Sequence, residues 1–158
     1  PGRSEESDIA YRRNAEIVIP DELDLSALCY IFCRSAAEKE ALLYLLPANL
    51  QRSYKNKIAA TTRSMLFFRQ HTFVETVRLS SRAAAFHFSP DTESPGPFHL
   101  RVEYKDKYGQ ERYEDGEFQA QRPLQLKFPR IVSKYTVQLN LDEHLAYANS
   151  YEEMDLLF

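Results

Sequence analysis

The sequence predicts an α+β protein, with a short strand–strand–helix part followed by an antiparallel β-sandwich or barrel-like part. Two observations lead to this prediction. One capped helical pattern starts near residue 36, and alternations of period two dominate after residue 65. With 44% hydrophobic and 27% charged residues, the 158-residue chain has the composition of a folded globular protein, large enough for one domain or two small ones.

The composition also bears on location. No apolar run approaches the roughly 18 to 20 residues of a membrane helix, and no basic-then-apolar signal segment opens the chain. We therefore expect a cytoplasmic protein that does not contact the membrane. The sequence starts with Pro1 rather than Met, so we expect it to be an internal piece of a longer protein.

The N-terminal part contains two predicted strands. Residues 15–19 are a short run of mostly apolar residues closed by Pro20, and residues 29–34 are rich in Tyr, Ile and Phe, which favour strands. A turn or a single helical turn at residues 21–28 joins them.

The helix is predicted from its start and stop signals. Ser35 and Glu38 have the spacing of a capping box, in which each residue satisfies a free amide of the other. The pattern predicts a helix from Ala36 to about Leu46. Pro47 should end it, because proline lacks an amide donor and disfavours helical geometry in the residue before it.

The two cysteines, Cys29 and Cys33, are spaced CxxxC. On one extended strand their α-carbons would lie about 13 Å apart, too far for a disulfide, so we expect two buried free thiols. The four histidines are scattered, and no second cysteine pair is present. We therefore predict no metal site.

Residues 48–63 form a polar, basic connector that could have helical character. Its cations Arg52, Lys55 and Lys57, with aromatic residues between them, could follow a nucleic-acid backbone. The alternative is a solvated linker whose aromatics enter the next core. The predicted boundaries are 1–49 for the N-terminal part, 50–64 for the connector and 65–158 for the β-rich part with its tail.

The β-rich part is predicted from short alternating runs separated by turn signals. Residues 98–105 and 110–114 form a hairpin around Asp106-Lys107-Tyr108-Gly109. Further strands are expected at 73–79, 84–88, 124–128 and 135–141, and residues 90–97 form a loop.

Two surfaces of this part leave alternatives open. The residues His99, Arg101, Glu103 and Lys105 are either a solvated strand face or a ligand-binding face. Residues 142–158 mix apolar, aromatic and acidic side chains and predict a short amphipathic helix. That tail could pack on its own domain or enter the groove of a partner.

The residue most relevant to chemistry is Glu16, which lies between Arg12-Arg13 and the apolar run that follows. It is either a surface carboxylate paired with an arginine, worth about 0 to 1 kcal/mol, or a working carboxylate on a rigid strand.

One longer segment around this glutamate reads Tyr11-Arg12-Arg13-Asn14-Ala15-Glu16-Ile17-Val18-Ile19-Pro20-Asp21. It is followed by Leu25, Ile31 and the helix start at Ser35-Ala36-Ala37-Glu38. This pattern resembles the C-terminal part of the DarT family. DarT enzymes are toxins that transfer ADP-ribose from NAD onto bases of single-stranded DNA. The match covers roughly the first fifty residues.

The resemblance implies that residues 1–49 are the C-terminal piece of an ADP-ribosyltransferase fold. Glu16 would be the catalytic glutamate, and Tyr11, Arg12 and Arg13 would belong to the loop that seats the target base. A carboxylate there can stabilise the oxocarbenium character that develops when nicotinamide leaves the ribose.

The resemblance also implies NAD as a substrate, bound mainly by a region outside this chain, and single-stranded nucleic acid and a protein antitoxin as partners. The chain has only four glycines and no Gly-rich phosphate loop. The alternative function is a non-catalytic β-sandwich module that recognises a protein partner.

Overall fold

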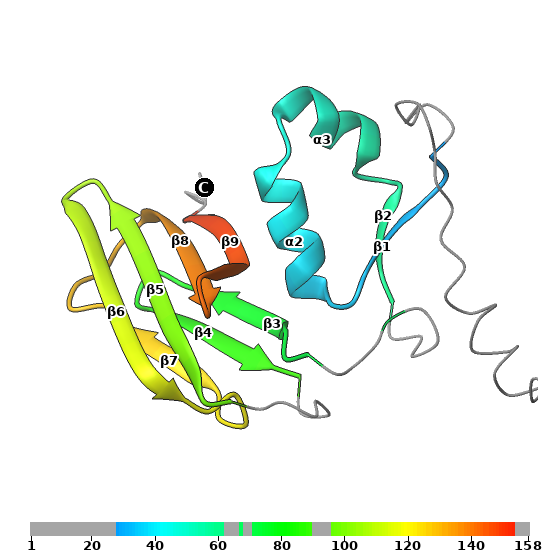
Figure 1. Cartoon of the computed structure of the whole chain (residues 1–158). Helices are drawn as coiled ribbons and strands as arrows, with labels where there is room; N and C mark the ends of the chain where they lie inside the picture. Colours follow the sequence, from blue (N-terminus) through cyan, green and yellow to red (C-terminus); the bar gives the residue numbers. More distant parts are fainter. Residues whose placement is uncertain (1–27, 62–66, 68–70, 90–95, 154–158) are drawn as a thin grey trace, which may run out of the picture.

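The computed structural model describes residues 28–61, 67, 71–89 and 96–153, and these form a mixed α+β fold made mostly of strands. Figure 1 shows the helix α2 lying between a small sheet and the larger β-rich layers. The elements of the described residues are β1 (Ile31–Cys33), α2 (Ala36–Leu45), α3 (Ala48–Tyr54), β2 (Ile58–Ala60), β3 (Val74–Leu79), β4 (Ala83–Phe88), β5 (Phe98–Asp106), β6 (Gly109–Phe118), β7 (Leu124–Lys127), β8 (Lys134–Leu141) and β9 (His144–Glu152).

The first four elements form a crossover unit. Strands β1 and β2 pair in parallel, with Ile31 opposite Ile58, and the two helices connect them. The predicted strand at 29–34 is confirmed in its central residues. Strand β2 was not predicted, because the segment 48–63 is polar and only Ile58 is a large β-branched aliphatic residue within it; the strand depends on pairing with β1.

Helix α2 follows the prediction closely. It begins after Ser35 and ends at Leu45, and Leu46 has extended backbone angles (φ −71°, ψ 139°) immediately before Pro47. Pro47 then precedes α3, which is the helical character anticipated for the connector. The proline thus separates two helices, because its ring prevents a continuous one.

The β-rich part contains two antiparallel sheets, one with strand order β3-β4-β7 and one with order β6-β5-β8-β9. The expected strands and the β5–β6 hairpin are confirmed. In that hairpin Asp106 lies opposite Gly109, and the Asp106 Oδ1 atom accepts hydrogen bonds from the amides of Tyr108 (2.7 Å) and Gly109 (3.0 Å). The aspartate therefore holds the turn, as its side chain does in Asx turns.

The prediction of a helix in residues 142–158 is wrong. Asp142 and Glu143 both have left-handed φ angles (48° and 67°), so the chain reverses directly after β8 and returns as β9. The Asp142 Oδ1 atom also accepts a hydrogen bond from the amide of His99 (2.8 Å), which ties this turn to the start of β5. Residues 144–152 are therefore a strand, because pairing with β8 outweighs their local composition. Residues 154–158 lie outside the described residues.

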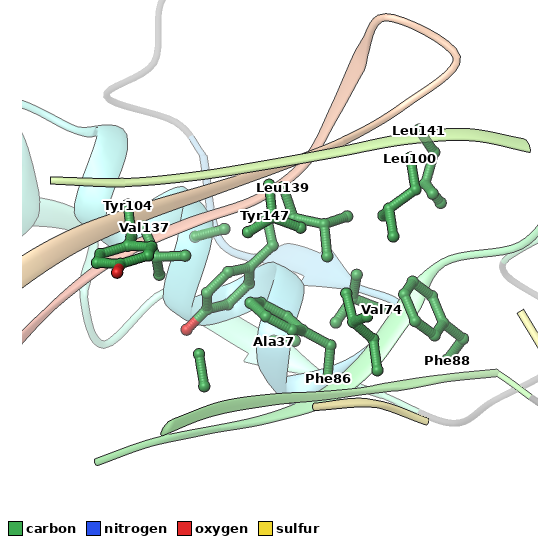
Figure 2. Packing of buried hydrophobic residues seen from close by; sticks show 14 of the residues in the cluster. Ala37, Val74, Phe86, Phe88, Leu100, Tyr104, Val137, Leu139, Leu141 and Tyr147 are labelled. Atoms are coloured by element: carbon green, nitrogen blue, oxygen red, sulfur yellow. The ribbon is translucent and has the colours of Figure 1, made fainter. Parts of the chain in front are cut away.

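The core lies between the two antiparallel sheets. Figure 2 shows Phe86 and Phe88 of β4 pointing toward Leu100, Leu139 and their neighbours on the other sheet. The described strands of the β-rich part form two separate sheets, so of the two expected forms, sandwich or barrel-like, the structure has the sandwich-like pair of layers.

Helix α2 belongs to the same core. Its buried residues Ala37 and Ala41 are in one cluster with both sheets, and the helix packs against β9 and β3. Small alanine side chains let the helix approach the sheet closely. The hydroxyl of Tyr147 on β9 donates a hydrogen bond to the Glu40 Oε2 atom (3.1 Å). The predicted boundaries 1–49, 50–64 and 65–158 stay predictions.

Candidate functional site

The residues predicted for catalysis and substrate binding lie outside the described residues, as does the strand predicted at 15–19. They are Glu16, Tyr11, Arg12 and Arg13. Their roles therefore stay predictions. The candidate site on the described chain is the crossover unit that directly follows them, β1–α2–α3–β2.

The two faces of the β1–β2 sheet differ sharply. Ile58 and Cys33 are buried on the face covered by α2, whereas Tyr30 is 62% exposed and Phe32 46% exposed. The rings of Tyr30 and Phe32 are stacked, with centroids 5.8 Å apart and an interplanar angle of 18°. Because side chains alternate along a strand, these two aromatics share the outer face.

Lys57 lies on the same outer face. Phe32 is opposite Ala59, so the strand alternation places Lys57 beside Tyr30. The Lys57 ammonium donates a hydrogen bond to the Leu28 carbonyl (2.5 Å) and lies 5.7 Å from the centroid of the Tyr54 ring. Lys57 thus connects the chain before β1 to the chain before β2, a structural role that the sequence did not indicate.

The other two predicted cations, Arg52 and Lys55, are exposed on and just after α3, and no ion pair is found for either within the described part of the chain. The stretch from residue 41 to residue 74 contains no Asp or Glu, although the chain has 23 acidic residues in total. The surface around β1, α3 and β2 is therefore locally cationic. Cations beside exposed aromatic rings can bind phosphates and stacked bases.

The junction between β1 and α2 is held by three polar side chains. The Ser35 Oγ atom accepts a hydrogen bond from the Glu38 amide (3.0 Å) and donates one to the Val74 carbonyl (2.6 Å). The Glu38 carboxylate accepts from the Arg34 amide (2.8 Å) and from Arg34 Nε (2.7 Å). The capping half of the predicted box is confirmed, but the carboxylate returns to Arg34 rather than to Ser35.

Arg34 is fixed on a second side as well. Its guanidinium carbon lies 4.7 Å from the centroid of the Phe73 ring, and its terminal nitrogen forms an ion pair with Glu38. Arg34 and Glu38 line a cleft of about 480 Å³ between α2 and the adjoining ends of the sheets, together with Leu42, His71, Asp142 and His144. Glu38 is engaged with Arg34, so this cleft contains a positioned ion pair rather than an unpaired carboxylate.

The cysteine prediction is correct in one respect and wrong in another. Neither Cys29 nor Cys33 forms a disulfide, but only Cys33 is buried, because Cys29 precedes the strand and is exposed. Burial, and to a lesser degree the charge of Glu38, raise the pKa of the Cys33 thiol. A buried thiol with a raised pKa is a poor nucleophile at neutral pH. Among the described residues, no group of three or more His, Cys, Asp or Glu side chains is placed to hold a metal ion.

The polar residues of β5 alternate with buried ones, and both interpretations of the polar face stay predictions. Leu100, Val102 and Tyr104 are buried, and the intervening residues point outward. Arg101 and His99 each contact the carboxylate of Glu143, at 3.4 Å and 3.5 Å. Arg101 also pairs with Glu103 on the same face (3.8 Å), so three of the four polar residues of this face form ion pairs with one another or with the β8–β9 turn.

The fold and the candidate site define a mixed α+β protein with an open aromatic and cationic face on a small parallel sheet. No family model, no curated protein and no solved structure matches the chain. None of the helices in the described segments is both long enough and apolar enough to span a membrane.

The sequence patterns did not reveal the exposed aromatic face. Tyr30 and Phe32 alternate with Ile31 and Cys33, and all four side chains are apolar or aromatic. The sequence pattern therefore does not distinguish the solvent-exposed face of β1 from its buried face. The acid-free stretch at residues 41–74 is a signal that could have directed attention to this surface.

Proposed function

We propose that this chain is the C-terminal part of a DarT-like enzyme that transfers ADP-ribose from NAD onto bases of single-stranded DNA. The observation that carries the proposal is the Arg-Arg-Asn-Ala-Glu segment at residues 12–16, followed at the expected spacing by strand β1 and the capped helix α2. The locally cationic face with Tyr30 and Phe32 supports a nucleic-acid substrate, since stacking on aromatic rings and contacts to phosphates are how single strands are bound.

In the proposed reaction the bond between the anomeric carbon of the ribose and the nicotinamide nitrogen breaks. Nicotinamide leaves with the bonding electrons, and a base nitrogen or oxygen forms the new bond to the same carbon and releases its proton to water. Glu16 stabilises the positive charge that develops on the ribose and orients its hydroxyl. Arg12 and Arg13 contact phosphate or stack on the base, and Tyr11 seats it.

NAD is the donor in this scheme, and the region that binds most of it would precede Tyr11 in the longer protein. A cytoplasmic location fits this donor, which is abundant there. A protein antitoxin is the expected partner of such a toxin.

The test uses the longest open reading frame that contains this chain, with and without Glu16→Gln. Transfer of labelled ADP-ribose from NAD to a single-stranded oligonucleotide should fall by at least about 100-fold in the variant, because a pre-organised electrostatic group contributes that much to such a step. Circular dichroism and the urea midpoint should be unchanged. Full activity in Glu16→Gln would reject Glu16 as the catalytic residue, whereas no transfer by the unaltered protein would reject the proposal and favour the non-catalytic interaction module.

A further inference from the structure

The outer face of the three-stranded sheet has small side chains along its centre and longer ones on both sides. Ala84 of the central strand β4 is fully buried, so the alternation of side chains places Ala83 and Ala85 on the outer face. Ala85 lies opposite Arg78 of β3 on one side and opposite Gln125 of β7 on the other. Long polar side chains therefore flank a strip of alanines on this sheet.

A cleft of about 430 Å³ lies at the end of this sheet where β4 begins and β7 ends. Arg82, Lys127 and Arg130 line it, and none of its described lining residues is Asp or Glu. Arg130 pairs with Asp106 (2.9 Å), whereas no ion pair is found for Arg82 or Lys127 among the residues that the structure describes. Two cations of the cleft are therefore available to an anionic ligand.

The backbone holds these two cations near each other. Lys127 lies opposite Ala83 in the β4–β7 ladder, and the amide of Phe128 donates a hydrogen bond to the carbonyl of Arg82 (2.9 Å). Arg78 continues the cationic surface along β3, and the spacing of strands and residues places its α-carbon about 12 Å from that of Lys127. Positive charges this far apart can contact more than one anionic group of an extended ligand.

The charge pattern of the sequence agrees with this surface. Residues 76–90 and 118–141 contain no Asp or Glu, although the whole chain has a net charge of −3. In the described strands of this sheet and in the β3–β4 turn, Glu75 is the one acidic residue, and it lies near the opposite end, where Val74 pairs with Phe88. Positive charge is therefore concentrated on one layer of the fold, which raises the local concentration of anions.

The chemistry of the surface favours phosphate groups over an acidic protein. Among the exposed large hydrophobic residues of the described segments, only Ile131 borders the cleft, whereas the centre of a protein–protein interface is rich in aromatic and apolar side chains. The planar guanidinium group of arginine matches the geometry of a phosphate.

We propose that Arg78, Arg82 and Lys127 bind the phosphodiester backbone of a nucleic-acid strand. Contacts to phosphates carry no sequence information, so binding here should depend little on the bases. This inference deepens the proposed function and rests on it for the choice of nucleic acid as the polyanion.

The test measures the binding of a fluorescein-labelled single-stranded oligonucleotide by fluorescence anisotropy, without NAD, at several salt concentrations. The double variant Arg82→Gln/Lys127→Gln should bind about tenfold or more weakly at low salt. Its slope of log affinity against log salt should be smaller by about 1.4, since each phosphate contact to a single strand contributes about 0.7. Arg78→Gln should lower the slope by about 0.7.

The matched control is Arg112→Gln/Lys134→Gln, which removes the same charge from two cations that already pair with Glu114 and Glu152. This variant should keep the slope of the wild type. Amide chemical shifts of β4 and β7 should change when the oligonucleotide is added, whereas those of β6 should not.

Equal slopes in the two double variants would overturn the proposal. So would equal competition by a polyglutamate of the same charge as the oligonucleotide, because the surface would then accept any acidic chain. Since the assay follows binding alone, a failure of ADP-ribose transfer and a failure of this binding are separate outcomes.

Discussion

The hydroxyl of Ser35 donates a hydrogen bond to the carbonyl of Val74, across 39 residues of sequence, at a distance of 2.6 Å. Ser35 is only 5% exposed and Val74 is fully buried. The same oxygen accepts from the Glu38 amide, so one side chain starts α2 and ties it to β3. The position of the crossover unit on the β-rich layers therefore depends on this residue.

Substitution Ser35→Ala should lower the free energy of unfolding by about 1 to 3 kcal/mol. It removes a helix cap and leaves a buried carbonyl without its donor, and each of these costs of order 1 kcal/mol or more. Urea denaturation followed by circular dichroism measures the change.

The matched control is Ser53→Ala, whose exposed hydroxyl donates only to the Asn49 carbonyl within α3 (3.2 Å). That variant should stay within about 0.5 kcal/mol of the wild type. Ser35→Thr, which keeps the hydroxyl, should recover part of the loss. Equal stability of Ser35→Ala and Ser53→Ala would contradict the role of this bond.

Two buried tyrosines predict sensitivity to alkali. Burial raises the pKa of Tyr135, although its hydrogen bond to the Ser80 carbonyl (3.1 Å) opposes the shift. Burial is likewise the main cause that raises the pKa of Tyr147, which contacts Glu40 and Asn149. In both residues folding favours the neutral phenol.

The neutral phenols contribute to the free energy of unfolding, and this contribution is fully present below about pH 10, the pKa of tyrosine in the unfolded chain. It is lost as the pH rises above that value toward the raised pKa of the folded state. Each group should contribute a slope of at most about 1.4 kcal/mol per pH unit in that range. Urea midpoints measured between about pH 8 and pH 11 should therefore fall steeply above about pH 10.

Replacing Tyr147 by Phe should flatten this fall, while Tyr113→Phe should not, since Tyr113 on β6 is 41% exposed. A Tyr147→Phe variant with the same alkaline slope as the wild type would show that the phenol ionises without cost in the folded state.

The outer face of β1–β2 gives a prediction that rests on the proposed function but needs no NAD. The chain should bind a fluorescein-labelled single-stranded oligonucleotide at low salt, and Phe32→Ala or Tyr30→Ala should each weaken binding about 10- to 100-fold, as stacking contributes about 1 to 3 kcal/mol per base. Fluorescence anisotropy measures the affinity.

Removing the exposed cations Arg52 and Lys55 should lower the slope of affinity against salt by about one for each phosphate that they neutralise. Tyr113→Ala, another exposed tyrosine, is the control and should bind like the wild type. If Phe32→Ala and Tyr113→Ala bind equally well, the face is not a stacking surface, whatever the activity of the Glu16→Gln variant.

Much of the local structure could be predicted because its signals lie within a few residues. Ser35 and Glu38 start α2, and Pro47 separates it from the next helix. The alternation from Phe98 to Lys105 and the Asp106 turn specify the β5–β6 hairpin. The Arg-Arg-Asn-Ala-Glu segment and its proposed chemistry rest on sequence alone, since they lie outside the described residues.

The tertiary structure decided what depends on partners far away in the chain. Strand β2 exists because it pairs with β1, and residues 144–152 are a strand because the Asp142–Glu143 turn brings them back along β8. Which side of β1 is buried follows from the position of α2, which covers Cys33 and leaves Phe32 exposed. Capping and alternation are local free-energy terms that the sequence determines by itself, whereas pairing and burial depend on surfaces that only the folded chain brings together.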